Sequence, residues 1–317
     1  MEKKLDTLSI IIPVYNSENT IELVINQIIE VLANKIKYEI ILVNDGSKDN
    51  SYQKCIKLAN QYNFLKFINL SKNFGQHNAI IAGLRFASGQ LILFMDDDLQ
   101  TTPVEIWKLI DKLNEGYDVV YANYIEKYHN KLQNLGSLIN DKMLCLFLKK
   151  PPSLKITSFF IIRRFLADEI IKYEGPFPYL GGLILRATNN IGIVTVQHSK
   201  RLYGKSNYSF FKLINLWLNG FTNFSIKPLR ISFFLGLFFS IISFLFSIAL
   251  VIRKLIDTNI YLGWTSLIVA ILFFSGIQLI LVGLVGEYVG RVFLSINKQP
   301  QYVIKEKYNI NNNFEKK

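Results

Sequence analysis

Short apolar runs alternate with longer amphipathic segments through the first two-thirds of the chain. The apolar runs predict buried strands at residues 8–14, 38–43, 64–70, 91–95, 117–121, 156–162 and 191–197. The segments between them have the apolar spacing of helices, at residues 18–33, 50–62, 76–87, 104–114, 131–148 and 165–173. Strands that alternate with helices in this way predict an α/β fold with a doubly wound, mostly parallel, Rossmann-like sheet.

The last third of the chain has a different pattern. Residues 231–252 and 258–286 are 22 and 29 residues long and contain no charged side chain. Either stretch is long enough to span a bilayer core of about 30 Å as a helix. We therefore predict a transmembrane hairpin over residues 230–290, with helices at about 231–252 and 261–286. The aromatic stretch 208–229 predicts an amphipathic helix lying in the membrane interface, with a buried core helix as the alternative.

These patterns divide the chain into a domain at residues 1–207, the interfacial helix, the hairpin and a tail at 291–317. Basic residues are more frequent on the flanks of the hairpin than in its loop, where Arg253 and Lys254 lie. The positive-inside rule therefore places the domain and both termini in the cytoplasm, on a multi-pass protein of the inner (cytoplasmic) membrane. The tail from residue 298 onwards is expected to be unstructured.

Composition and charge indicate which classes of partner the protein is expected to bind. The net charge of +12 suits anionic lipids or phosphorylated substrates. The soluble part contains no block of basic residues interleaved with aromatic ones and no zinc-finger spacing, so we predict no nucleic-acid partner. Two cysteines, Cys55 and Cys145, give no disulfide framework. The first residues do not have the pattern of a signal peptide. The oligomeric state stays open, a homo-oligomer included.

An acidic triplet, Asp96-Asp97-Asp98, follows directly after the apolar run 91–95. Open α/β sheets bind ligands at the carboxyl ends of their strands, and adjacent carboxylates repel each other unless a cation lies between them. Alternate residues of an extended segment point the same way, so Asp96 and Asp98 are candidates to share one Mg²⁺ or Mn²⁺ that also binds phosphates. A solvated acidic turn before the helix that starts near Pro103 is the alternative.

Five stretches in order are SIIIPVYNSENT, ILVNDGSKDNS, LSKNFGQHNAIIAG, FMDDDLQTTP and HSKRLYGKSNY. With the terminal hairpin they resemble family 2 glycosyltransferases of the GT-A fold. They resemble in particular the polyprenyl-phosphate glycosyltransferases, a group that includes dolichyl-phosphate mannose synthase. The resemblance implies an inverting, membrane-bound enzyme that moves a sugar from a nucleotide-diphosphate sugar to an undecaprenyl or dolichyl phosphate.

The resemblance also implies a metal site and catalytic residues. Asp96, Asp98 and Gln100 match the family's pattern for binding a divalent cation, Mg²⁺ or Mn²⁺. Asp98 and Arg201 are expected to take part in catalysis. Asp96 and Asp97 are placed with the donor-binding residues, although Asp97 stands where relatives often have alanine, so its own role is open.

Other residues are matched to the nucleotide sugar. Pro13, Tyr15 and Glu18 are expected to border the base and the ribose, and Asp45 to hydrogen-bond the base edge. Ser206, together with Arg201, matches a loop that closes over the phosphates. Each of these segments has a plainer interpretation as a turn or as charges that face the membrane.

The chain departs from the family pattern at two positions. Ser158 precedes Phe159 where many relatives have aspartate, and Asn207 stands where relatives have lysine. Three rival functions therefore remain. The first is a membrane glycosyltransferase that acts on a glycan hydroxyl, the second is a non-catalytic GT-A membrane scaffold, and the third is a nucleotidyltransferase. The third lacks the expected glycine-rich loop after the first strand.

Overall fold

The computed structural model describes residues 7–124, 151, 154–175, 178–197, 199, 263–297 and 299–310, together with scattered positions between 229 and 252. Contacts divide the chain into two units, residues 1–214 with 298–317, and residues 215–297. The predicted helices at 131–148 and 208–229 lie outside the described residues, apart from position 229.

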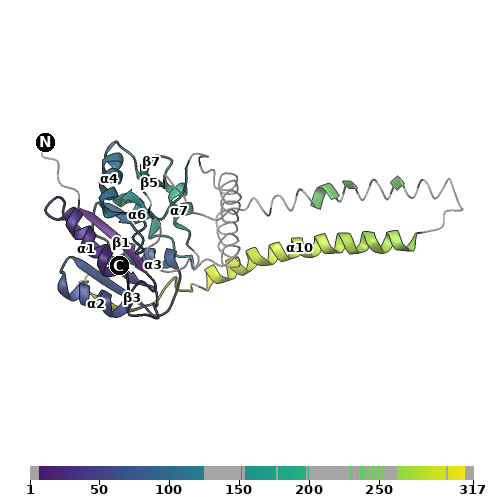
Figure 1. Ribbon diagram of the computed structural model, residues 1–317. Coiled ribbons are helices and arrows are strands. Elements are labelled where there is room, and N and C mark those ends of the chain that lie inside the picture. The colour runs from purple at the N-terminus through teal and green to yellow at the C-terminus, as the bar shows by residue number, and fades with distance from the viewer. Residues whose placement is uncertain are drawn as a thin grey trace. The chain divides into compact units, whose positions relative to one another are not determined.

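The first unit is built on a mixed sheet with the strand order β7-β5-β6-β4-β1-β2-β3-β8 among the described residues (Figure 1). The strands are β1 (Leu8–Val14), β2 (Tyr38–Asn44), β3 (Leu65–Leu70), β4 (Leu91–Phe94), β5 (Val119–Tyr124), β6 (Phe160–Arg163), β7 (Ile191–Val196) and β8 (Ile304–Tyr308). Strands β4, β1, β2 and β3 pair in parallel, as do β5 and β7. Strand β6 runs antiparallel between β4 and β5, and β8 runs antiparallel to β3. All residues of β1 are buried, as expected for a strand covered on both faces.

Helices cover both faces of this sheet, which makes it doubly wound as predicted. The helices are α1 (Ile21–Leu32), α2 (Ser51–Gln61), α3 (Gln76–Leu84), α4 (Ile106–Asn114), α6 (Arg164–Ile170) and α7 (Leu180–Ala187), with a 3₁₀ turn at Pro103–Glu105. Apolar residues of α1, α2 and α4 share one core cluster with alternate residues of β1, such as Ile10 and Ile12. Helix α3 packs on the opposite face, where a Cβ added at Gly83 would lie 2.8 Å from the Ile11 side chain.

The strand predictions agree with the structure to within a few residues, but two elements were missed. Helix α7 contains Gly181 and Gly182, which weaken the helical signal in the sequence. A Cβ at Gly181 would lie 3.0 Å from the Ile156 side chain, so the absence of a side chain lets this helix pack closely. The second missed element is β8.

The prediction that the tail is unstructured is wrong for the segment that contains β8. The sequence of β8, IKEKY, is highly charged and has little apolar signal. Pairing with β3 supplies its backbone hydrogen bonds, and the ring of Tyr308 stacks on that of Phe67 with centroids 5.7 Å apart. The side-chain amide of Asn309 donates to the carbonyl of Leu65 at 2.9 Å, and that of Gln301 donates to the carbonyl of Gly175 at 2.8 Å. The segment therefore belongs to the first unit.

The second unit contains α10 (Trp264–Ile296), a helix of 33 residues. The second transmembrane helix was predicted to end at about residue 286, so α10 extends further than expected. Among the described residues, the part of it from Phe273 to Leu294 has the length and apolar composition that a membrane span needs, with a mean hydropathy of 1.7. Large apolar side chains along it are exposed, including Leu279 and Ile280. The other helix of the predicted hairpin falls mostly outside the described residues, so the hairpin remains a prediction.

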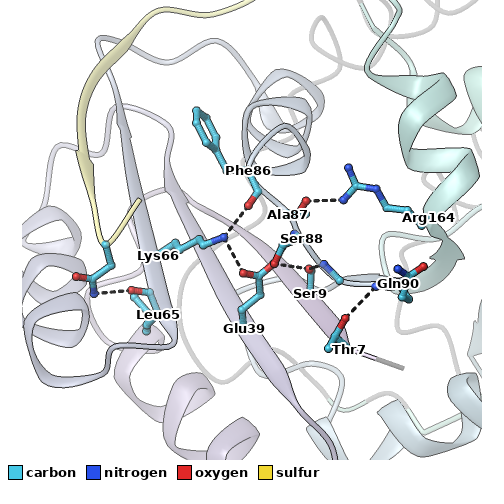
Figure 2. A network of polar contacts seen from close by, with 12 residues as sticks. Thr7, Ser9, Glu39, Leu65, Lys66, Phe86, Ala87, Ser88, Gln90 and Arg164 are labelled. Atoms are coloured by element: carbon cyan, nitrogen blue, oxygen red, sulfur yellow. Dashed lines mark hydrogen bonds and ion pairs between the residues drawn. The ribbon is translucent and has the colours of Figure 1, made fainter. Parts of the chain in front are cut away.

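A polar network joins the amino-terminal ends of β1, β2 and the loop before β4 (Figure 2). The Glu39 carboxylate forms an ion pair with the Lys66 ammonium at 2.7 Å and accepts hydrogen bonds from the Ser9 hydroxyl and the Ser88 backbone N–H, both at 2.6 Å. Lys66 also donates to the carbonyl of Phe86 at 2.9 Å. Burial alone would raise the pKa of Glu39, but the bonds from Lys66, Ser9 and Ser88 outweigh it and hold the pKa below its usual value.

Replacing Glu39 with Gln is expected to lower the free energy of unfolding by about 2 kcal/mol at pH 7, because Lys66 loses its charged partner. The folded pKa of Glu39 lies below the unfolded value of 4.5, so this stabilisation is complete above pH 4.5 and is lost as the pH falls through the folded pKa. Urea unfolding of the detergent-purified protein between pH 3.5 and pH 7 tests this.

The matched control for Glu39 is Lys57→Gln. The Lys57 side chain is 73% exposed and pairs with Glu22 at 3.5 Å. Its loss should change stability by less than about 0.5 kcal/mol. A difference between wild type and Glu39→Gln that stays constant down to pH 3.5 would contradict the assignment.

Candidate active site

The loops that follow β1, β2 and β4 meet at one edge of the sheet. These strands are parallel neighbours in register, with Ile11 paired to Ile41 on one side and to Phe94 on the other. Parallel neighbours end at the same edge, and ligands of open α/β sheets bind there. The segments from Tyr15, from Asp45 and from Asp96 are therefore brought together, as the sequence predicted.

The first two loops are tied to each other by reciprocal hydrogen bonds. The backbone N–H of Glu18 donates to the Asp49 carboxylate at 3.1 Å, and the N–H of Asn50 donates to the Glu18 carboxylate at 3.0 Å. Asn16, with φ of 55°, adopts the left-handed conformation that asparagine tolerates. Pro13 lies buried in β1, paired with Val43. Glu18, which was predicted to border the nucleotide, thus also holds the loop after β1 against the loop after β2.

Asp45 links the end of β2 to the loop before α3. Its carboxylate is 3% exposed and accepts the backbone N–H groups of Phe74 at 2.7 Å and Gly75 at 2.9 Å. Burial raises the pKa of Asp45, and these two bonds oppose the rise. Gly46, with φ of 66°, allows the close approach, since a Cβ there would lie 2.6 Å from the backbone N of Asn73. Each oxygen keeps a further lone pair, and its predicted contact with a base edge stays a prediction.

The three carboxylates of the acidic triplet are held by different parts of the structure. Asp96 accepts the side-chain amide of Gln76 on Oδ1 at 2.8 Å and the hydroxyl of Ser158 on Oδ2. Asp97 accepts the backbone N–H of Tyr15 at 3.2 Å and the hydroxyl of Ser17. Asp97 is therefore turned toward the loop after β1, which gives a structural role to the residue whose role the sequence left open.

Burial is the main cause that raises the pKa of Asp97 to about 7, and the negative charges of Asp96 and Asp98 add to it. The bonds from Ser17 and Tyr15 act in the opposite direction. Asp98 accepts the backbone N–H of Gln100 at 3.1 Å. The residue between them, Leu99, is buried with φ of 61°, an uncommon conformation for leucine. The backbone of this segment is therefore more constrained than that of a simple solvated acidic turn.

Gln100 connects the triplet to the segment after β7. Its carbonyl accepts the backbone N–H of Ser199 at 2.8 Å, and its side-chain amide lies 3.4 Å from the carbonyl of Ser199. Arg201 and Ser206 follow Ser199 in the sequence but lie outside the described residues. Their predicted contacts with phosphates are therefore untested.

The oxygen atoms of Asp96, Asp98 and Gln100 are ligands of the kind that Mg²⁺ and Mn²⁺ prefer. Within the described ranges, no group of three or more His, Cys, Asp and Glu side chains is arranged to hold a metal ion by itself. Mg²⁺ in phosphate-binding enzymes is commonly held by one or two carboxylates, with the remaining ligands from water and from the substrate's phosphates. The residues present fit an ion of this second kind.

The family model for "Glycosyl transferase family 2" matches residues 9–171, which include all three loops of this site. The chain belongs to glycosyl transferase family 2. It is therefore a glycosyltransferase, as the resemblance implied, and the scaffold and nucleotidyltransferase alternatives are set aside.

Relatives from several bacteria match this family 2 chain along nearly its whole length. An undecaprenyl-phosphate 4-deoxy-4-formamido-L-arabinose transferase of Proteus mirabilis is 32% identical over 315 residues, covering 96% of this chain and 94% of the relative. A prophage-derived bactoprenol glucosyl transferase of Shigella flexneri is 31% identical over 309 residues, covering 95% and 98%. An uncharacterized glycosyltransferase of Bacillus subtilis is 33% identical over 310 residues, covering 96% and 95%.

Solved structures confirm the GT-A-like fold. Glucosyl-3-phosphoglycerate synthase of Mycobacterium tuberculosis, in complex with Mn²⁺ and UDP-glucose, superposes with a TM-score of 0.53 at 18% identity. The match covers 68% of this chain and 77% of that one. The same enzyme with Mg²⁺ and UDP also gives a TM-score of 0.53. These neighbours show that proteins of this fold bind a divalent cation together with UDP.

Several residues around the triplet were not predicted as site residues. Gln76 lies in one of the five stretches that carry the resemblance, but it was given no role. Ser17 and Tyr124 had no signal beyond being polar residues near strand ends. Ser158 was noticed only as a departure from the family pattern, and its contact with Asp96 depends on which strand lies beside β4.

Replacing Asp97 with Asn should make the protein less sensitive to pH. The folded pKa of Asp97, about 7, lies above the usual value of 3.8. As the pH rises, the unfolded chain therefore loses this proton at a lower pH than the folded protein does. Wild-type stability should therefore fall by about 1–3 kcal/mol between pH 5 and pH 8, whereas Asp97→Asn should lack this decline. Urea unfolding in buffer with EDTA measures both slopes, and equal slopes would contradict the prediction.

Proposed function

We propose that this glycosyltransferase transfers a sugar from a nucleotide-diphosphate sugar to the phosphate of a polyprenyl lipid at a membrane. The observation that carries the proposal is the similarity over at least 94% of each chain to relatives named for undecaprenyl phosphate and bactoprenol. This similarity includes the apolar last third as well as the family 2 domain. The product would be a lipid-linked sugar for assembly of the cell envelope or of a glycan.

The donor is assigned to the edge of the sheet where the three loops meet. Pro13, Tyr15, Glu18 and Asp45 would surround the nucleoside. Asp96, Asp98 and Gln100 would hold Mg²⁺ or Mn²⁺, which when bound supplies positive charge beside the donor's diphosphate. The carboxyl-end position of these residues supports the assignment, as does the binding of UDP-glucose with Mn²⁺ by the structural neighbour.

The acceptor phosphate attacks the anomeric carbon of the sugar in line with the leaving group. Its oxygen forms the new bond while the bond from that carbon to the nucleoside diphosphate breaks, which inverts the configuration. A phosphate monoester is already ionised near neutral pH, so this step needs no strong general base. Ser158 in place of a carboxylate is compatible with such an acceptor. The chain contributes chiefly positioning and charge stabilisation, with Arg201, two residues after Ser199, assigned to the phosphates.

Membrane anchoring accounts for the apolar last third. The exposed apolar side chains of α10 would face lipid, and the predicted hairpin would keep the enzyme at the depth of the lipid phosphate. The excess of basic residues on the hairpin flanks favours a catalytic domain and termini in the cytoplasm.

The direct test incubates the detergent-purified protein with undecaprenyl phosphate and a panel of nucleotide sugars, and identifies products by mass spectrometry. We expect one sugar to appear on the lipid through an acid-labile phosphodiester bond. Undecaprenol, which lacks the phosphate, is the matched control and should give no product. Transfer to undecaprenol, or an acid-stable glycoside as the main product, would favour a hydroxyl acceptor and overturn the proposal.

Asp98→Asn should reduce transfer by more than about 100-fold, because it removes a charged ligand of the ion that stabilises the leaving group. Asp111→Asn, at an exposed position of α4, is the matched control and should retain wild-type turnover. Initial rates with the donor identified above give the comparison, and unfolding curves check that both variants fold. Full activity in Asp98→Asn would reject the metal assignment.

A further inference from the structure

Strand β6 brings Ser158 opposite Asp96. In the antiparallel pairing of β4 with β6, Leu93 lies beside Ile161 and Phe94 beside Phe160. Two residues further, the same register places Asp96 opposite Ser158, and the Ser158 hydroxyl donates to Oδ2 of Asp96. The rings of Phe94 and Phe160 stack with centroids 4.4 Å apart just before this point, so the register is held by packing.

Strand β5 supplies the next member of the network. Tyr124 is the last residue of β5, which pairs with β6 on the side away from β4. Its hydroxyl lies near the hydroxyls of Ser158 and Thr101, and both of these contacts lower its pKa. Thr101 follows Gln100, in the segment that carries the acidic triplet. Polar groups from three adjacent strand ends thus lie close to one another.

The direction of the bond between Ser158 and Asp96 follows from their chemistry. A serine hydroxyl has a single proton to donate, and an ionised carboxylate can only accept, so Ser158 is the donor. Burial and the Asp96 charge raise the pKa of Tyr124 to about 12, while the contacts with Thr101 and Ser158 lower it, so the Tyr124 hydroxyl keeps its proton at neutral pH.

Gln76 and Ser158 together fix the orientation of the Asp96 carboxylate. Gln76 donates to Oδ1 and Ser158 donates to Oδ2, so a donor on each oxygen restricts the rotation of the carboxylate. Groups that orient a ligand in this way commonly change metal affinity about 10–100-fold when they are removed. The proton of Ser158 is directed at Asp96, which makes Ser158 unsuited to act as a base.

We infer that Ser158 is a positioning residue that orients Asp96 for the divalent cation. A carboxylate at position 158 would place a second negative charge beside Asp96, whereas Ser158 supplies a donor. The inference rests on the proposed function, because it takes Asp96 to be a metal ligand. It assigns Ser158 a role in cation binding rather than in proton transfer.

Direct binding of Mn²⁺ tests this without any measurement of turnover. Free Mn²⁺ is followed by electron paramagnetic resonance, first with the full-length protein alone and then with whichever of UDP, GDP, CDP and TDP binds the wild type most tightly. Ser158→Ala should raise the dissociation constant for Mn²⁺ about 10-fold, and Tyr124→Phe should raise it by less than about threefold, since Ser158 keeps its bond to Asp96. Ser158→Thr keeps the hydroxyl and should stay within about twofold of wild type.

Thr157→Val is the matched control. The Thr157 hydroxyl donates to backbone carbonyls, that of Ala122 at 2.9 Å and that of Phe159 at 3.2 Å, rather than to Asp96. This variant should therefore alter stability at most and leave Mn²⁺ affinity unchanged. Wild-type protein that binds no Mn²⁺ under either condition would overturn the proposed metal site itself. Wild-type binding that is matched by Ser158→Ala, or weakened equally by Thr157→Val, would overturn only the role of Ser158.

Discussion

Mutual repulsion among three adjacent carboxylates is the constraint on which this site depends. Their charges follow directly after a buried strand, where repulsion is poorly screened. The fold separates them by giving each a different set of donors. Asp97 turns to the loop after β1, Asp96 faces Gln76 and Ser158, and Asp98 bonds within its own turn. The left-handed backbone at Leu99 is part of this arrangement.

The same separation joins the loops at this edge of the sheet into one structure. Asp97 holds the loop of Tyr15, Asp45 holds the loop that leads into α3, and Gln100 meets Ser199. Each of these acidic or amide residues thus forms a hydrogen bond with the backbone of a neighbouring loop. A donor nucleotide would meet loops that are already connected, which reduces the ordering that binding must supply.

The two ends of the sheet carry polar groups for different purposes. At the amino-terminal ends, Glu39 and Lys66 form a closed network whose carboxylate is met by an ammonium and by hydrogen-bond donors (Figure 2). At the carboxyl ends, Asp96 and Asp97 accept hydrogen bonds from neutral donors, among them the Gln76 amide, the Ser158 hydroxyl and the backbone N–H of Tyr15. Carboxylate oxygens in such a position at the carboxyl ends of parallel strands are suited to the cation and phosphates of the proposed function.

The sequence by itself determined the alternation of strands and helices, the position of the acidic triplet at a strand end and the family. These features depend on local hydrophobic spacing and on short motifs, which the chain carries in order. Only the tertiary structure decided that β6 lies antiparallel beside β4, that the charged segment IKEKY becomes β8, and that Asp97 faces the loop after β1. The physical reason is that each depends on a partner distant in sequence. Ser158 is 62 positions from Asp96, and no local sequence pattern predicts which strand will lie between β4 and β5.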